Sequence, residues 1–357
     1  MIKLSLCMIV KDEESVLPRC LDSVKDCVDE IVIVDTGSTD QTVCLARKYT
    51  DLIFPFEWKN DFSLARNYSL SKGTGDYLMW LDADDVIEET DKEKLLSLKK
   101  LLTSTPYDIV NAQYKTVFNA DTPPLSYERE RIFKRDKNFT FQGFVHECVA
   151  PNGRIFHSDF CVTHRPIEKQ ARTGRNLDLY RFHIQNGRTL SPRDLFYYAR
   201  ELYYNGYLLE SEGVFQAFLK NEQSWYVNKI EATKFIALCK AQKEDFSGAL
   251  SVLFSSFLYG EPRAYILCEI AHIFIRKREY QNALFWYLSA MRCSSKQQEG
   301  DFENGADFTL TPMLGISYCH FHLGNFSAAR RTHEELKRLY PTHPSVLYNE
   351  KFFSSHT

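Results

Sequence analysis

Short apolar runs, each ending in polar residues, alternate with amphipathic segments through the first quarter of the chain. The apolar runs occupy residues 4–10, 30–34, 52–54 and 77–81. Runs of this length are typical of buried β-strands, and the intervening segments, such as residues 63–70, have the pattern of amphipathic helices. The alternation of strand and helix predicts right-handed βαβ units and a parallel sheet, so we expect an α/β fold in this part of the chain.

Two carboxylates separated by one residue, Asp82 and Asp84, follow the buried run 77–81 directly. Open α/β sheets bind ligands beyond the carboxyl ends of their strands, which is where these two residues fall. Such a pair suits a hard divalent cation that keeps some water and takes phosphate oxygens as further ligands. The other interpretation is an acidic loop in which Asp85 caps a helix over residues 86–100. The spacing alone leaves both interpretations open.

Polar residues also follow the first two predicted strands, at residues 11–13 and at Asp35. A nucleotide lying across these strand ends would contact Asp35 through its base or ribose and Arg66 near its phosphates. Taken singly, Asp35 is equally a turn residue and Arg66 equally a surface or salt-bridged side chain. No GxxxxGK[ST] motif occurs, and no GxGxxG motif follows the first strand, which argues against a P-loop and a dinucleotide fingerprint.

Four segments of the N-terminal half carry a specific set of motifs in a fixed order. They are Ser5–Glu13 (SLCMIVKDE), Val34–Asp40 (VDTGSTD), Ala65–Asn67 (ARN) and Trp80–Asp84 (WLDAD). In these segments the chain resembles the family 2 glycosyltransferases. More narrowly, it resembles the bacterial members with a helical-repeat tail, which include the transferases that modify glycocin bacteriocin peptides on Cys or Ser. The resemblance implies a GT-A fold (a Rossmann-like α/β domain), a UDP-sugar donor, Mg²⁺ or Mn²⁺, and inversion at the anomeric carbon.

The resemblance also implies roles for individual positions. Asp35 would meet the uracil, and Asp82 and Asp84 would bind the metal, with His164 as a third ligand or as a structural histidine. Arg172 belongs to a basic run that would clamp the diphosphate or form a solvated helix face. The implied cofactor-binding set is Val10, Lys11, Glu13, Asp35, Arg66, Asn67, Asp82, Ala83, Asp84 and Arg172.

An adjacent acid–base pair, His146 and Glu147, lies in an apolar segment of the second half of this domain. One-step inversion needs a base that takes the proton of the acceptor. Because the family carries a similar Val-His-Glu segment, we expect the catalytic residues to be Glu147, as the base, and His146. The alternative is that Glu147 holds His146 or an arginine in place. A thiol acceptor would demand less of the base than a hydroxyl, because it ionises more readily.

The pattern changes after residue 190, where helical hairpins with similar turns replace the strands. Alignment of these turns puts a large apolar residue at Leu208, Phe246, Tyr280 and Phe326. Small residues follow three positions later, at Ser211, Ala249, Ala283 and Ala329. The spacing is close to the tetratricopeptide (TPR) period and predicts a TPR-like array of about four hairpins. We expect a GT-A domain at 1–170, a linking helix at 171–190 and an all-α TPR-like domain at 191–357.

The composition limits the kinds of partner and the compartment that we expect for this chain. A net charge of −3 gives no basic excess for nucleic acid, and no apolar run is long enough for membrane insertion. Ten cysteines without paired spacing indicate reduced thiols in the cytoplasm. We expect UDP-glucose or UDP-GlcNAc as donor, a bacteriocin precursor peptide as acceptor, and an aromatic helical tail suited to a homodimer. The alternatives are transfer to a surface glycan or lipid-linked saccharide, and a TPR scaffold whose transferase domain is inactive.

Overall fold

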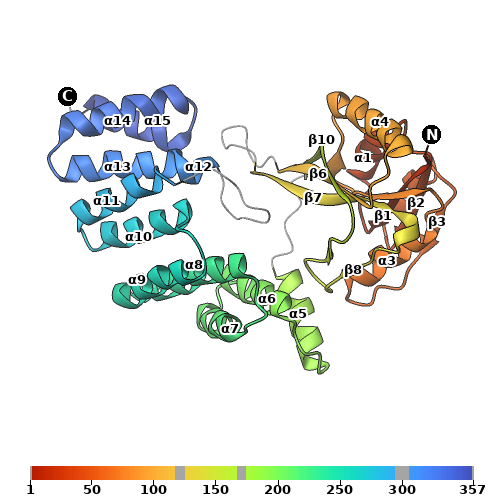
Figure 1. Cartoon of the computed structure of the whole chain (residues 1–357), viewed down its shortest axis with the longest axis horizontal. Coiled ribbons are helices and arrows are strands. Elements are labelled where there is room, and N and C mark those ends of the chain that lie inside the picture. The colour runs from red at the N-terminus through yellow and green to blue at the C-terminus, as the bar shows by residue number, and fades with distance from the viewer. Residues whose placement is uncertain (1, 117–124, 167–173, 294–304, 356–357) are drawn as a thin grey trace. The chain divides into compact units, whose positions relative to one another are not determined.

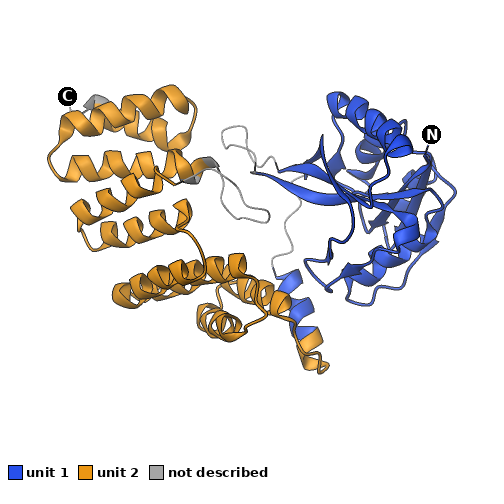
Figure 2. Cartoon of the chain, in the orientation of Figure 1, with its two compact units in different colours: residues 1–118, 124–182 blue, residues 119–123, 183–357 orange. Residues whose placement is uncertain are grey.

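The chain divides into two compact units. The computed structural model describes residues 2–116, 125–166, 174–293 and 305–355 (Figure 1). Of these, the residues up to Phe182 form unit 1 and those from His183 onward form unit 2 (Figure 2). This boundary falls inside helix α5 (Arg175–Gln185), within the stretch that the sequence assigns to a linking helix. The limits at 170 and 191 stay predictions.

The described part of unit 1 is built on an eight-stranded mixed sheet with the order β3-β2-β1-β4-β7-β6-β10-β5. Its strands are β1 (Leu4–Val10), β2 (Glu30–Asp35), β3 (Ile53–Pro55), β4 (Tyr77–Trp80), β5 (Asp85–Val86), β6 (Ile109–Thr116), β7 (Leu125–Lys134) and β10 (Ile155–His164). Strand β1 pairs in parallel with β2 and β4, as predicted. Strand β7 is antiparallel to both β4 and β6, which makes the sheet mixed and not parallel throughout.

Both faces of the sheet are covered (Figure 1). On one face, α1 (Leu17–Val24) and α4 (Glu89–Ser104) contribute their leucines to a core that includes Met79 of β4. On the other face, Leu70 of α3 (Phe62–Lys72) packs into a second core with Trp80 of β4. Neighbouring residues of β4 therefore enter different cores, because side chains alternate across a strand. This explains why residues 77–81 are apolar without a break.

The alternative interpretation of the acidic segment, in which Asp85 caps a helix over residues 86–100, is wrong. Helix α4 begins at Glu89, and Asp85 and Val86 instead form β5, which pairs antiparallel with β10. The reason is that the Asp85 carboxylate is fully buried and accepts hydrogen bonds from groups on other strands, which a solvent-exposed helix cap would not. Shorter elements complete the unit: α2 (Thr42–Ala46), β8 (Phe141–Gln142) and β9 (Cys148–Val149).

The described part of unit 2 is helical, and its helices pack in sequential hairpins (Figure 1). The hairpins are α6 (Pro192–Tyr204) with α7 (Leu208–Lys220), α8 (Tyr226–Gln242) with α9 (Phe246–Ser255), α10 (Ala264–Arg276) with α11 (Tyr280–Ala290), and α13 (Leu310–His322) with α14 (Phe326–Leu339). The short helix α12 (Gly305–Phe308) precedes α13, and α15 (Pro344–Ser355) packs on α14.

The predicted repeat pattern is confirmed residue by residue. Helices α7, α9, α11 and α14 begin at the four large apolar residues that open the repeats. The four small residues three positions later are fully buried. One of them, Ser211, donates a hydrogen bond of 2.8 Å from its hydroxyl to the carbonyl oxygen of Ala199 on the preceding helix. Small side chains at these positions let neighbouring helices approach closely.

Two further expectations bear on the environment of the chain. None of the helices in the described residues is long and apolar enough to cross a membrane. All ten cysteines are free thiols, and Cys7, Cys20, Cys27, Cys161, Cys239, Cys268 and Cys319 are buried.

Candidate functional site

Two carboxylates and one imidazole converge beyond the end of β4. The β5–β10 pairing places His164 opposite Asp85, and Asp84 precedes Asp85 in the chain. The Nδ1 atom of His164 lies 3.4 Å from Oδ1 of Asp84 and 3.7 Å from Oδ1 of Asp85. One ligand atom from each of the three residues fits within a span of 4.8 Å. The structure thus brings together Asp84 and His164, two of the three predicted metal ligands.

The donor atoms of this cluster suit a divalent cation. Carboxylate oxygens are the preferred ligands of Mg²⁺ and Mn²⁺, and imidazole is a common nitrogen ligand. The Nδ1 atom of His164 is buried and makes no well-aligned hydrogen bond with any described residue. Polar contacts with Asp84 and then Asp85 raise the pKa of His164 to about 10. A cation bound here would take the place of that proton.

Asp85 is a candidate ligand that the sequence analysis did not identify. Its carboxylate is fully buried beside the equally buried Arg131, with 3.1 Å between Asp85 Oδ2 and Arg131 Nη1. It also accepts a 3.1 Å hydrogen bond from the hydroxyl of Tyr114 and a 3.0 Å hydrogen bond from the backbone N–H of Asp82. In the sequence, the only signal for the Asp85–Arg131 pair is the alternation of charge along β7, in the adjacent residues Glu128, Arg129, Glu130 and Arg131.

A buried arginine connects two of the predicted site carboxylates. Nη2 of Arg66 lies 2.7 Å from Oδ1 of Asp82, and Nε of Arg66 lies 2.6 Å from Oε1 of Glu147. The Arg66 guanidinium also stacks 4.4 Å from the ring centre of Trp80. Asp82 is not one of the three residues whose ligand atoms lie within 4.8 Å of one another, and its role as a metal ligand stays a prediction.

The charges around Asp82 favour its ionised form. Burial raises the pKa of this carboxyl, but the guanidinium groups of Arg66, Arg131 and Arg129 outweigh that effect and lower it well below its usual range. Burial lowers the pKa of Arg66. The carboxylates of Asp82 and Glu147 have the opposite and larger effect, so this pKa is raised above its usual value. Both members of the Arg66–Asp82 pair are consequently charged at neutral pH.

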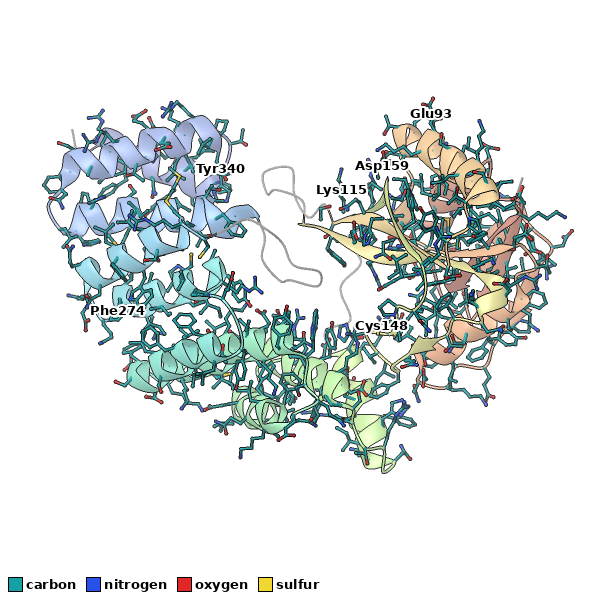
Figure 3. The ribbon with its side chains drawn as sticks, in the orientation of Figure 1. Glu93, Lys115, Cys148, Asp159, Phe274 and Tyr340 are labelled. Atoms are coloured by element: carbon teal, nitrogen blue, oxygen red, sulfur yellow. The ribbon has the colours of Figure 1, made fainter. Side chains whose placement is uncertain are left out.

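Glu147 precedes β9 in a segment that is attached to α3. The backbone N–H of Phe62 donates a hydrogen bond to the carbonyl oxygen of Phe144. Strand β9 begins directly after Glu147, at Cys148, which is labelled in Figure 3. The neighbouring His146 has a left-handed backbone with φ of 52°. The structure places Glu147 on Arg66, which matches the alternative that this carboxylate holds an arginine, so its role as the base stays a prediction.

The other predicted site residues make backbone contacts, lie at strand ends, or differ in their exposure. Asn67 exchanges two hydrogen bonds with the backbone of Phe141, of 3.0 and 2.7 Å, and so holds β8 against α3. The strand-end residues of β1 and β2 lie side by side, because Val10 pairs with Asp35. Asp35 accepts from the N–H groups of Gly37 and Ser38, in keeping with the turn role considered above. The remaining positions are Lys11, which is exposed, Glu13, which is half-buried, Ala83, which is buried, and Arg172, which lies outside the described residues.

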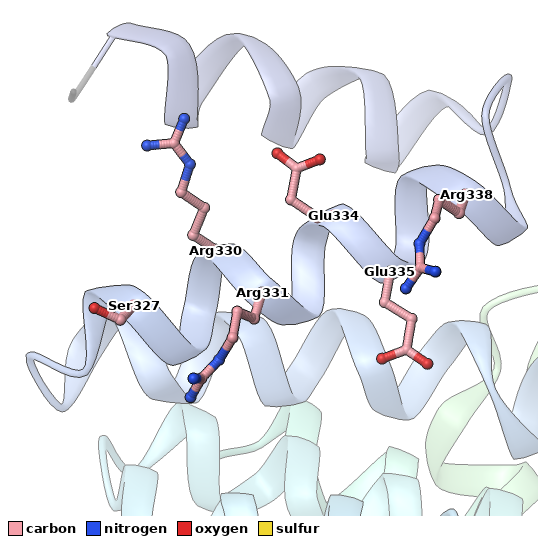
Figure 4. A pocket seen from close by; sticks show the side chains of 6 residues that line it. All are labelled: Ser327, Arg330, Arg331, Glu334, Glu335 and Arg338. Atoms are coloured by element: carbon pink, nitrogen blue, oxygen red, sulfur yellow. The ribbon is translucent and has the colours of Figure 1, made fainter.

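A shallow recess on α14 of unit 2 is a weaker candidate (Figure 4). It is lined by Ser327, Arg330, Arg331, Glu334, Glu335 and Arg338, all from one helix. Positive and negative side chains alternate along this helix, so the recess does not favour one class of charged ligand. The cluster in unit 1 combines side chains from β5, from β10 and from the turn before β5, and it is the stronger candidate.

Comparison with known proteins identifies the family of the N-terminal domain. Residues 5–162 match the model of glycosyl transferase family 2. The chain is 40% identical over 152 residues to the TPR repeat-containing protein Synpcc7942_0270 of Synechococcus elongatus, covering 42% of this chain and 36% of that protein. It is 29% identical over 211 residues to the SPbeta prophage-derived glycosyltransferase SunS of Bacillus subtilis, covering 55% of this chain and 48% of that protein. The matches thus span about half or less of these relatives.

One solved structure that aligns with this chain is that of Staphylococcus aureus TarS residues 1–349. It shares 15% sequence identity and covers 85% of this chain and 99% of that one, with a TM-score of 0.37. A TM-score of this size supports no detailed transfer. The family match covers the whole mixed sheet as far as Val162 of β10, and the helical array follows it. The chain therefore carries a glycosyl transferase family 2 domain of GT-A fold at residues 5–162, followed by a TPR-like helical region.

Proposed function

We propose that this protein is an inverting, metal-dependent glycosyltransferase that moves a hexose or HexNAc from a UDP-sugar to Cys or Ser side chains of a bacteriocin precursor peptide. The observation that carries the proposal is the cluster of Asp84, Asp85 and His164 at the ligand-binding edge of a family 2 domain. An acidic cluster next to the buried Arg66–Asp82 pair gives this edge groups that suit both a cation and a sugar diphosphate.

The reaction would exchange one bond at the anomeric carbon. The acceptor sulfur or oxygen attacks this carbon, the bond from the carbon to the diphosphate oxygen breaks, and UDP leaves with the bonding electrons. A cation held by Asp84, Asp85 and His164 would neutralise the charge that develops on UDP. The proton of the acceptor goes to a base, for which Glu147 is the proposed residue, with His146 beside it.

A peptide acceptor is supported by the helical unit. Stacked helical hairpins present extended surfaces that suit a polypeptide, whereas a small sugar needs only a pocket. The resemblance of the N-terminal motifs to transferases of glycocin peptides points to the same acceptor class. The exposed Phe254, Phe285 and Phe326 on the second helices of three hairpins support the proposal that this unit mediates a homodimer. Ten free thiols support the cytoplasm as the compartment.

The test is incubation of the full chain with UDP-glucose or UDP-GlcNAc, Mg²⁺ or Mn²⁺, and a Cys- and Ser-containing bacteriocin precursor. Release of UDP together with a hexose or HexNAc mass shift of the peptide would support the whole proposal. The control is Asp84→Asn, which removes one cluster ligand and should abolish both signals. Release of UDP without a peptide shift would contradict the peptide acceptor and favour a glycan acceptor. Neither signal with any donor or cation would favour the scaffold alternative.

A further inference from the structure

Three guanidinium groups surround the buried side chain of Trp80. Their central carbons lie 4.4 Å (Arg66), 4.7 Å (Arg129) and 4.0 Å (Arg131) from the ring centre. The indole N–H donates to the carbonyl oxygen of Glu130, at 2.7 Å, which fixes the ring against β7. Aromatic faces attract cations, but three positive charges around one ring also repel one another unless anions lie nearby.

Two of the three charges have carboxylate partners, and the third has none in the described residues. Arg66 is paired with Asp82 and Glu147, and Arg131 is paired with Asp85. Arg129 forms no ion pair with any residue that the structure describes, and its guanidinium lies over the rings of Trp80 and, at 5.5 Å, Tyr114. Its side chain is half-buried, whereas that of Arg131 is fully buried.

Arg129 lies at the same edge of the sheet as the acidic cluster. The pairing of β7 with β4 ends at Ile132 opposite Met79, so the first half of β7 extends past the end of β4. Arg129 belongs to this extension, where it pairs with Ala112 of β6. Its guanidinium lies over the same Trp80 ring as that of Arg66, whose Nη2 is 2.7 Å from Oδ1 of Asp82.

We propose that Arg129 binds the diphosphate of the nucleotide-sugar donor. This inference rests on the proposed function and adds to it a second cationic group for the leaving UDP, supplied by the protein. A planar guanidinium presents paired N–H donors that match phosphate oxygens in a bidentate manner. The two aromatic rings hold this group before a ligand arrives, which reduces the side-chain entropy lost on binding.

The competing explanation is that Arg129 only balances the charge of Asp82. The two explanations differ in what they predict for ligands with and without phosphates. A diphosphate ligand interacts with Arg129 and uridine does not, so loss of the guanidinium should weaken UDP alone. A purely structural arginine would, when removed, affect both ligands or neither.

The experiment is isothermal titration of UDP and of uridine into the full chain with Mg²⁺ present. The test variants are Arg129→Gln and Arg129→Lys, and Arg154→Gln is a matched control. Arg129→Lys keeps the charge but loses the planar guanidinium. Arg154 is an exposed arginine that stacks 4.9 Å from the ring of Tyr107, away from the cluster. Melting temperatures show whether each variant folds.

We expect Arg129→Gln to weaken UDP binding by about 10- to 100-fold, the loss of one charge-assisted contact, with uridine affinity unchanged. Arg129→Lys should lie between wild type and Arg129→Gln, and Arg154→Gln should match wild type. Unchanged UDP affinity in Arg129→Gln, or equal losses for UDP and uridine, would overturn the inference. A wild-type chain that binds uridine and UDP equally, or neither of them, would overturn the proposed UDP-sugar donor and the inference with it.

Discussion

Nε of Arg66 lies 2.6 Å from Oε1 of Glu147, so α3 and the segment before β9 meet through a buried ion pair. The same guanidinium reaches Asp82 at the end of β4. One arginine thereby fixes the relative positions of two carboxylates from distant parts of the chain. Glu147 can act as a base only if it also interacts with the acceptor, whereas its contact with Arg66 is sufficient for a positioning role.

Glu147→Gln separates these two roles. We expect the variant to retain UDP binding, because Arg66 keeps Asp82, and to lose transfer to a hydroxyl acceptor. Unfolding free energy should fall by roughly 1–3 kcal/mol, the cost of leaving a buried charged group short of a partner. The measurements are UDP titration, sugar transfer followed by mass spectrometry, and urea denaturation. Near-normal transfer to a hydroxyl acceptor together with the stability loss would assign Glu147 to positioning alone.

Asp84→Asn should remove cation binding and leave the fold intact. Asp84 lies at the partly exposed side of the cluster, and His164 is its ionic partner among the described residues. We therefore expect loss of Mn²⁺ binding, measured by titration calorimetry, with little change in urea denaturation. Chelation of wild type with EDTA should reproduce the loss of turnover. Full turnover in chelator would remove the metal from the proposed mechanism.

Asp85→Asn should lower stability in addition to removing one candidate ligand of the cluster. The substitution leaves the fully buried Arg131 without its counter-charge, which typically costs about 3–5 kcal/mol when a buried pair is broken. The matched control is the same chemical change one residue earlier, Asp84→Asn, where no buried cation is left unpaired. Urea denaturation of both variants gives the comparison. Equal, small effects at the two positions would contradict the structural importance of the Asp85–Arg131 pair.

The contact between α11 and α13 predicts a large effect for a small change, Gly315→Ala. A Cβ atom at Gly315 would lie 2.2 Å from a ring carbon of the buried Tyr287, so the helices or the ring must shift. We expect a loss of about 1–3 kcal/mol, as for other overpacked cores.

The control is Gly213→Ala in α7, where nothing lies within 4 Å of the added atom. There we expect a gain of about 0.5–1 kcal/mol, because alanine favours helix over glycine. Thermal unfolding followed by far-UV circular dichroism measures both. Equal stability of the two variants would show that the helices separate easily at Gly315.

The sequence predicts those parts of the fold that follow from local pattern. Strand β1 and helix α3 lie where the apolar spacing puts them, and Ala249 and Ala329 are buried as the repeat pattern requires. Asp85 could not be assigned in the same way. Whether a carboxylate caps a helix or enters a core depends on its partners, and Arg131 lies far from it in the chain. For the same reason, the sequence could suggest a contact between Glu147 and an arginine only as one of two alternatives.

The pairing of β5 with β10 has a consequence for the dynamics of the site. Strand β5 is two residues long and lies at the end of the sheet order, so few hydrogen bonds hold it. Opening of so short an edge strand costs less than global unfolding, but it also disturbs the contacts of the buried Asp85 side chain. The N–H of Arg165, which donates to the carbonyl oxygen of Asp84 at 2.9 Å, belongs to this connection. Amide hydrogen exchange at Arg165 would thus report directly on how often the ligands of the cluster separate.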